Sequence, residues 1–107
     1  MLIAPGAALQ AHSALQGSSP ASGSVLTRSP AAVTLTFNEP TRLTSLVLVT
    51  TDGKRRLAFA PTRSARSFTT RAPRLALGRN EIRWRALSQD GHVVEGSIII
   101  VLRRPSR

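Results

Sequence analysis

Apolar and polar residues alternate along several short segments, which is the pattern of β-strands with one buried face. The clearest segments are residues 33–38 and 82–87. In the second segment Arg83 and Arg85 mark the polar side of the strand. Pro40 is expected to end the first strand, because proline has no N–H to donate to a neighbouring strand. The residues predicted to point inward from these two strands are Val33, Leu35, Phe37, Ile82, Trp84 and Ala86.

Further strands are expected at 45–51, 55–60, 66–71 and 97–102. Asp52 and Gly53 give the clearest hairpin signal, between the first two of these. The segment 97–102 is continuously apolar and is predicted to lie centrally in a sheet. Residues 13–32 are rich in Ser, Ala, Gly and Pro, so we expect an irregular lead-in with at most a short strand, crossing the sandwich edge.

About seven strands with frequent turns and no helical periodicity predict an all-β fold, specifically an immunoglobulin-like antiparallel β-sandwich with Greek-key connections. The 107 residues suffice for one domain. We expect that domain to span residues 12–102, preceded by residues 1–11 and followed by a basic tail, 103–107.

Residues 88–96 predict a tight loop between two strands, and this loop carries Asp90 and His92. Gly91 lies between them and lets the chain bend sharply, so that the carboxylate and the imidazole can converge on one point. The simpler alternative is a solvated surface turn in which Asp90 accepts hydrogen bonds from backbone amides. The only other histidine of the chain is His12.

Residues 2–11 are uncharged and mostly small or apolar, and they resemble the end of a secretory signal peptide that is truncated at its start. They are too few to span a bilayer. Cleavage after Ala11 would make His12 the mature N-terminus, whose α-amine and imidazole form a chelate. Together with Asp90 and His92 they would supply three nitrogens and one oxygen, a set that suits Cu(II).

Composition narrows the function classes further. The chain has no cysteine, which excludes a disulfide or thiolate site, and its net charge of +10 attracts polyanions in general. The basic residues are spread over strands and loops and the aromatic residues occupy core-facing positions, so no specific nucleic-acid recognition is expected. Neither a nucleophile elbow nor a phosphate-cradling glycine loop is present, and we expect no catalytic residues.

Several segments, in this order along the chain, resemble the CopC family of copper resistance proteins. They are His12-Ser13-Ala14-Leu15, residues 18–23, Val33 to Pro40, Ile82 to Ser88 and Asp90-Gly91-His92. The resemblance covers nearly all of the chain from His12 to Leu102. It implies a small periplasmic β-sandwich that binds Cu(II) through His12, Asp90 and His92. Glu39 is a candidate for a group that supports these ligands without binding the metal.

The resemblance also implies one Cu(II) per chain, held by a monomer that is exported and cleaved after Ala11, with an inner-membrane copper transport protein as a possible partner. Some family members carry a methionine-rich Cu(I) site, which is not expected here because the only methionine is Met1. We therefore favour a non-enzymatic carrier or buffer for copper resistance and homeostasis. Two alternatives stay open: a copper oxidoreductase that uses the N-terminal histidine chelate, and an immunoglobulin-like interaction module without metal.

Overall fold

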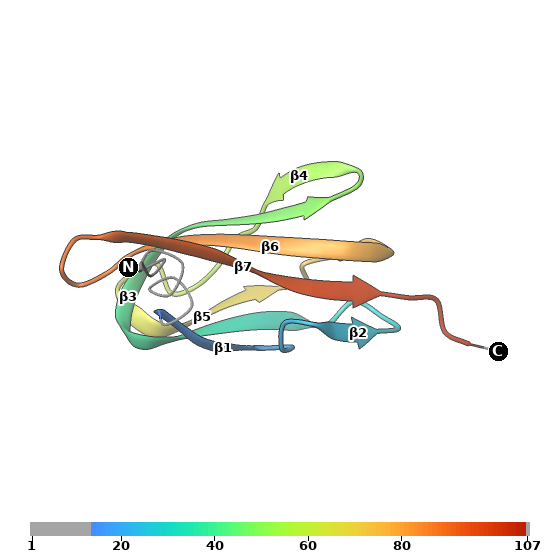
Figure 1. Cartoon of the computed structure of the whole chain (residues 1–107), viewed down its shortest axis with the longest axis horizontal. Coiled ribbons are helices and arrows are strands. Elements are labelled where there is room, and N and C mark those ends of the chain that lie inside the picture. The colour runs from blue at the N-terminus through green and yellow to red at the C-terminus, as the bar shows by residue number, and fades with distance from the viewer. Residues whose placement is uncertain (1–13, 107) are drawn as a thin grey trace, which may run out of the picture.

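The computed structural model describes residues 14–106, which form seven strands (Figure 1). They are β1 (Leu15–Ser19), β2 (Ser24–Leu26), β3 (Ala32–Thr50), β4 (Gly53–Arg56), β5 (Ala65–Arg71), β6 (Gly78–Leu87) and β7 (Val93–Leu102). Within this part of the chain, no helix is long and apolar enough to cross a membrane. The predicted signal peptide and His12 lie outside the described residues.

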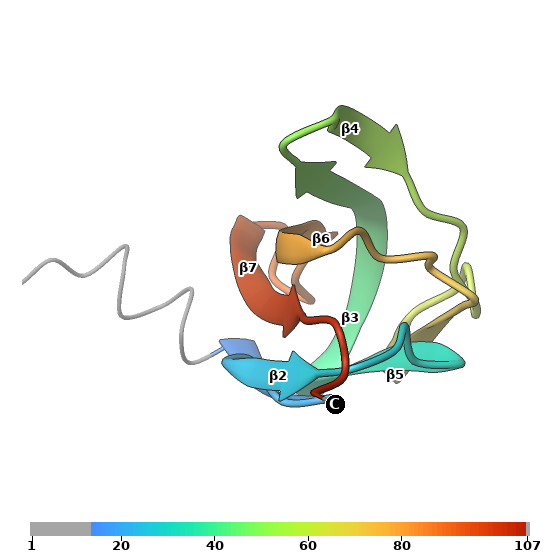
Figure 2. The ribbon, with the colours of Figure 1, turned by 90° about the vertical axis from the view of Figure 1, so that its right-hand side faces the viewer.

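The strands form two layers that face each other, as the two views in Figures 1 and 2 show. Sheet A contains β1, the first half of β3 and β5. Sheet B has the order β4, second half of β3, β6, β7, β2. The all-β sandwich predicted from the sequence is confirmed, as is the position of β7 inside its sheet. The pairing of β2 with β7 is parallel, which departs locally from the antiparallel prediction.

Strand β3 connects the two layers, and the prediction that Pro40 ends this strand is wrong. Pairing with β5 is interrupted between Thr36 and Thr41, and pairing with β6 begins only at Arg42. Pro40 thus lies where β3 passes from sheet A to sheet B, and no neighbouring strand requires an N–H donor at this position. The chain therefore tolerates proline in the middle of a 19-residue strand.

A bulge at Thr44 changes which face of β3 is buried. Leu43 pairs with Ala86 and Ser45 pairs with Arg85, so two steps along β3 match one step along β6. Side chains alternate between faces along a strand, and one extra residue reverses the alternation. As a result Leu43 is buried before the bulge, and the buried positions after it are Leu46 and Leu48.

Three other segments differ from the sequence prediction in their limits. Residues 13–32 contain two short strands, with β1 in sheet A and β2 in sheet B, so this segment does cross between the layers. Strand β4 ends at Arg56, since Leu57 turns into the core and its N–H donates to Leu46 O at 2.9 Å. Strand β7 begins at Val93, four residues earlier than expected, because residues 93–96 pair with residues 84–87.

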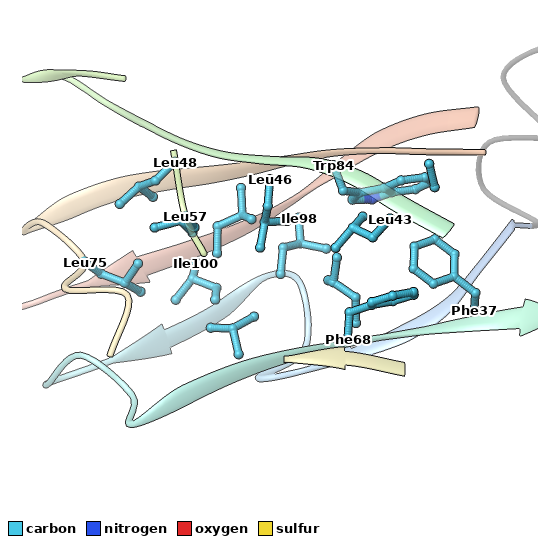
Figure 3. Close-up of a cluster of buried hydrophobic side chains, with 14 of the residues drawn as sticks. Phe37, Leu43, Leu46, Leu48, Leu57, Phe68, Leu75, Trp84, Ile98 and Ile100 are labelled. Atoms are coloured by element: carbon cyan, nitrogen blue, oxygen red, sulfur yellow. The ribbon is translucent and has the colours of Figure 1, made fainter. Parts of the chain in front are cut away.

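The core lies between the two sheets, and Figure 3 shows its aromatic end around Phe37, Phe68 and Trp84. The Trp84 ring packs edge to face against Phe37, with 5.1 Å between ring centroids, and Phe37 packs in the same way on Phe68 at 5.9 Å. Phe59 is only partly buried and packs at the margin of this cluster. The aromatic residues therefore have the core roles that the alternation predicted.

Gly96 allows β7 to lie directly against the indole of Trp84. A Cβ atom at this position would be 2.7 Å from Trp84 Cζ2, closer than real Cβ contacts allow. We expect Gly96→Ala to lower the free energy of unfolding by about 1–3 kcal/mol, because the buried ring cannot move away without disturbing the core. The control is Gly17→Ala, since nothing lies within 4 Å of that position. Urea denaturation of both variants tests this, and equal stabilities would contradict the close packing.

Asn80 is a fully buried polar residue that holds the start of β6 to the segment before it. Its Oδ1 accepts a hydrogen bond from Ala76 N at 2.8 Å. Its Nδ2 donates to the carbonyl oxygens of Ala76, Gly78 and Ile100 at 2.9–3.2 Å. A buried amide with all of its bonds made fixes the chain path instead of weakening the core. Residues 76–80 are thus tied firmly to β7.

Candidate metal centre

The candidate centre is the loop of residues 88–92, which joins β6 and β7 at one end of the sandwich (Figure 1). The last pair of the two strands is Leu87 with Val93. Ser88 N donates to His92 O at 2.8 Å, and Gly91 N donates to Ser88 O at 3.0 Å. Gly91 has φ +90, a left-handed conformation that glycine adopts without strain. The loop is therefore a closed turn whose shape depends on Gly91.

Asp90 and His92 meet in this turn. Asp90 Oδ2 lies 2.9 Å from His92 Nδ1, and Asp90 Oδ1 accepts a hydrogen bond from His92 N at 3.1 Å. The Ser88 hydroxyl donates to Asp90 Oδ1 and also lies 3.1 Å from His92 O. The predicted convergence of the carboxylate and the imidazole is thus seen in the structure.

Hydrogen bonds to the carboxylate lower the pKa of Asp90 to about 2. The largest cause is the hydrogen bond from the Ser88 hydroxyl, followed by the bonds from the side chain and the backbone of His92. Asp90 is consequently a carboxylate anion at every pH at which the fold would normally be studied. An ionised oxygen is the form that a metal ion needs.

Both side chains are open to solvent, with exposed fractions of 82% for His92 and 67% for Asp90. They line a depression of about 580 Å³ between the 88–92 loop and the part of β3 that passes between the sheets. Glu39 lines the depression from β3, and Ala14, the first described residue, lines it as well. The pair is therefore accessible from outside, and the N-terminal segment enters the described part of the fold beside it.

The other two predicted site residues are Glu39 and His12. Glu39 shares the depression, but it forms neither a hydrogen bond through its side chain nor an ion pair within residues 14–106. In that part of the chain, no three His, Asp or Glu side chains gather in a group suited to a metal ion. His12 lies outside the described residues, so the structure places only the two candidate ligands of the 88–92 loop.

Ser88 has a role that the sequence analysis missed. Its hydroxyl donates to the carboxylate of Asp90 and lies 3.1 Å from the backbone oxygen of His92, so it orients the pair from the start of the loop. Serine bonding a residue two positions later is common in turns, and the Ser-x-Asp spacing could have suggested the contact.

Fold and loop together define a small β-sandwich that presents an imidazole and a carboxylate at one end. A family model described as the CopC domain matches residues 15–101. The chain belongs to the CopC family. No curated protein matches it.

Solved structures show the same fold. The chain is similar to CopC from Methylosinus trichosporium OB3b, with 26% identity and a TM-score of 0.71 over 87% of this chain and 95% of that one. It is also similar to PcoC, a methionine-rich copper resistance protein from Escherichia coli, with 24% identity and a TM-score of 0.60 over 83% of this chain and 96% of that one. The family resemblance drawn from the sequence is therefore confirmed.

Proposed function

We propose that this protein binds one Cu(II) ion in the periplasm and carries or buffers it for copper resistance, without catalysing a reaction. The observation that supports this most strongly is the 2.9 Å separation between Asp90 Oδ2 and His92 Nδ1. Nitrogen and oxygen ligands bind such metals at about 2.0 Å, and two of them at right angles about the metal lie about 2.8 Å apart. These two atoms, which share a hydrogen bond in the structure, thus lie at a spacing that also suits neighbouring ligands of a tetragonal site.

The remaining ligands are proposed to come from His12. This residue is two positions before Ala14, which lines the same depression as Asp90 and His92. Two residues of chain span at most about 7 Å, and this short link to Ala14 supports His12 as the source of the remaining ligands. After cleavage following Ala11, its α-amine and imidazole would complete three nitrogens and one oxygen. Glu39, which lines the same depression, would support the centre without binding the metal.

A carrier fits this arrangement better than an oxidoreductase. If Asp90 occupies the fourth position in the plane of the metal, no in-plane position is left at which oxygen could bind. The exposure of Asp90 and His92 also suits exchange, because a partner's ligands can approach the metal from solvent. An inner-membrane copper transport protein is the proposed recipient, and the protein is proposed to act as a monomer.

Electron paramagnetic resonance of the protein during a Cu(II) titration tests the proposed site. We expect the spectrum of a tetragonal nitrogen and oxygen site that saturates at one Cu(II) per chain. Cu(I) should bind weakly by comparison, since Met1 is the only sulfur-containing residue. A stoichiometry of two, or a spectrum of the thiolate type, would contradict the proposal.

Substitution of the loop ligands should affect copper binding and leave the fold intact. We expect Asp90→Asn and His92→Ala to weaken Cu(II) binding strongly while changing the free energy of unfolding by at most about 1 kcal/mol, because both side chains are exposed. Asp52→Asn is the matched control, since Asp52 lies in the exposed turn at the other end of sheet B. Competition against a Cu(II) chelator measures the affinity. If Asp90→Asn and Asp52→Asn bind Cu(II) with the same affinity, Asp90 is not a ligand.

The pH dependence separates the contributions of the ligands. The pKa of Asp90 is lowered to about 2, so this carboxylate does not take up a proton between pH 4 and 8 and adds no pH dependence there. A free α-amine has a reference pKa of about 7.7–8.0, so protons compete with Cu(II) for the nitrogen of His12. We expect the affinity to fall steadily as the pH drops below neutrality, in competition titrations at several pH values. An affinity that stays constant from pH 8 down to pH 4 would contradict ligation by the α-amine.

A further inference from the structure

A second charged cavity lies at the end of sheet B opposite the candidate metal centre. It has a volume of about 280 Å³ and is formed by the β3–β4 hairpin and by residues 74–76. The pairing of β3 with β6 runs from Arg42 with Leu87 to Val49 with Glu81. The 88–92 loop lies next to the first of these pairs, and the β3–β4 hairpin lies next to the second. Figure 1 shows the hairpin and the 88–92 loop at opposite ends of the sheet. The two sites are therefore separate.

Positive charge gathers at this cavity without a matching negative charge. Lys54, Arg55 and Arg74 line it together with one acid, Asp52. Within residues 14–106 none of these four side chains takes part in an ion pair. Like charges held near one another repel, and a bound anion would relieve that repulsion.

The cavity wall is held in place by Arg55. Its Nη2 donates to Pro73 O at 2.6 Å and to Arg74 O at 3.1 Å. A guanidinium carries five N–H groups, so Nε and Nη1 keep three donors for another acceptor. An arginine fixed in this way loses little freedom when it binds a ligand, which favours recognition of an oxyanion by its planar fork.

The segment that presents Arg74 is strained and firmly anchored. Ala72 and Arg74 have φ +47 and +54, in the left-handed region that residues other than glycine rarely adopt. Between them Pro73 is fully buried. Ala72 N donates to Ala31 O at 2.8 Å, and Leu75 N donates to Ser29 Oγ at 3.0 Å. Strain that neighbouring contacts maintain is often found where a side chain must be held in position for binding.

We propose that this cavity binds a phosphate group, with Arg55 and Arg74 as its principal contacts and Lys54 adding positive charge. The volume of the cavity is several times the volume that one water molecule occupies in the liquid, about 30 Å³. The cavity therefore has room for a tetrahedral oxyanion. The phosphate belongs either to a free phosphate compound or to the headgroup of a phospholipid. This site is independent of copper binding.

The test is an NMR titration of copper-free, ¹⁵N-labelled protein with inorganic phosphate, against sodium chloride at the same ionic strength. We expect saturable shifts at one phosphate per chain in the amides of residues 52–55 and 74–76, and none in residues 88–92. Arg74→Gln should weaken binding about tenfold, the scale of one lost charge-assisted hydrogen bond. Arg55→Lys should weaken it similarly, because it keeps the charge but loses the fork. The control Arg103→Gln removes the same charge as Arg74→Gln from the exposed tail and should change nothing.

Sedimentation with phosphatidylcholine vesicles, with and without phosphatidic acid, distinguishes the two sources of phosphate. Binding to the phosphatidic acid vesicles that is lost in Arg74→Gln and kept in Arg103→Gln would assign a lipid headgroup. Saturable binding of inorganic phosphate without such vesicle binding would assign a free phosphate compound. Shifts that do not saturate, or equal effects of Arg74→Gln and Arg103→Gln, would overturn the proposal, provided that melting temperatures show both variants to be folded.

Discussion

A form of the protein that keeps residues 1–11, or that carries a tag ahead of His12, should bind Cu(II) at least ~100-fold more weakly than the form that begins at His12. In the longer form the nitrogen of His12 is an amide, which is neither basic nor a ready donor to a metal. One chelate ring is lost, and only the His12 imidazole, Asp90 and His92 remain. Losing a group that merely supports a metal ligand costs 10–100-fold in affinity, so the loss of a ligand should cost at least as much.

The sharpest comparison uses two forms of the protein that begin at His12, one with a free α-amine and one with that amine acetylated. Both are titrated against the same Cu(II) chelator at the same pH. Equal affinities would mean that the α-amine is not a ligand. Asp90→Asn in both backgrounds is the control, because it should weaken binding in each if the loop ligates the metal independently of the N-terminus.

Trp84→Ala should lower the free energy of unfolding by about 3–5 kcal/mol, a large part of the stability of a domain this small. The side chain is 3% exposed and packs between Phe37 and Gly96, so its removal leaves a cavity that the rigid sheets cannot close. Thermal melting and urea denaturation measure the loss. Copper ligation should be unaffected under conditions in which the variant remains folded.

Trp84→Phe is the matched variant. Within residues 14–106 Trp84 Nε1 is buried and has no hydrogen-bond partner, so phenylalanine removes an unsatisfied N–H together with part of the ring. We expect a smaller loss than for Trp84→Ala. Val93→Ala, at an exposed position, should change stability by less than about 0.5 kcal/mol. If Trp84→Ala had the same melting temperature as Val93→Ala, Trp84 would not be a core residue.

Much of the fold was predictable because burial on one face of a strand leaves a period of two in the sequence. Val33, Leu35 and Phe37 showed that period, and all three are buried. The Asp52-Gly53 hairpin was predictable because few residue pairs favour so tight a turn. These signals are local, so they can be recognised in the sequence without knowledge of the neighbouring strands.

The features that were missed depend on contacts distant in sequence. Pro40 normally ends a strand, and only the passage of β3 between two sheets makes it harmless. The bulge at Thr44 is defined by its partner strand, so the run from Leu46 to Val49 could not show which residues are buried. Likewise β2 is only three residues long and owes its existence to pairing with β7.

The candidate site was predictable to the extent that it is local. Asp90, Gly91 and His92 lie within one turn, and their convergence follows from the sequence. The place of Glu39 in the same depression does not follow from local sequence, since β3 and the 88–92 loop are far apart in the chain, and it was expected only from the family resemblance. The cluster of Arg55 with Arg74 could not be foreseen either, because 15 basic residues spread through the sequence give no sign of which ones meet.

Native mass spectrometry of the exported protein, with and without Cu(II), tests the central claim most directly. We expect a chain that begins at His12 and gains the mass of one copper ion when Cu(II) is added. A chain that begins elsewhere, or one that begins at His12 and gains no copper, would contradict it.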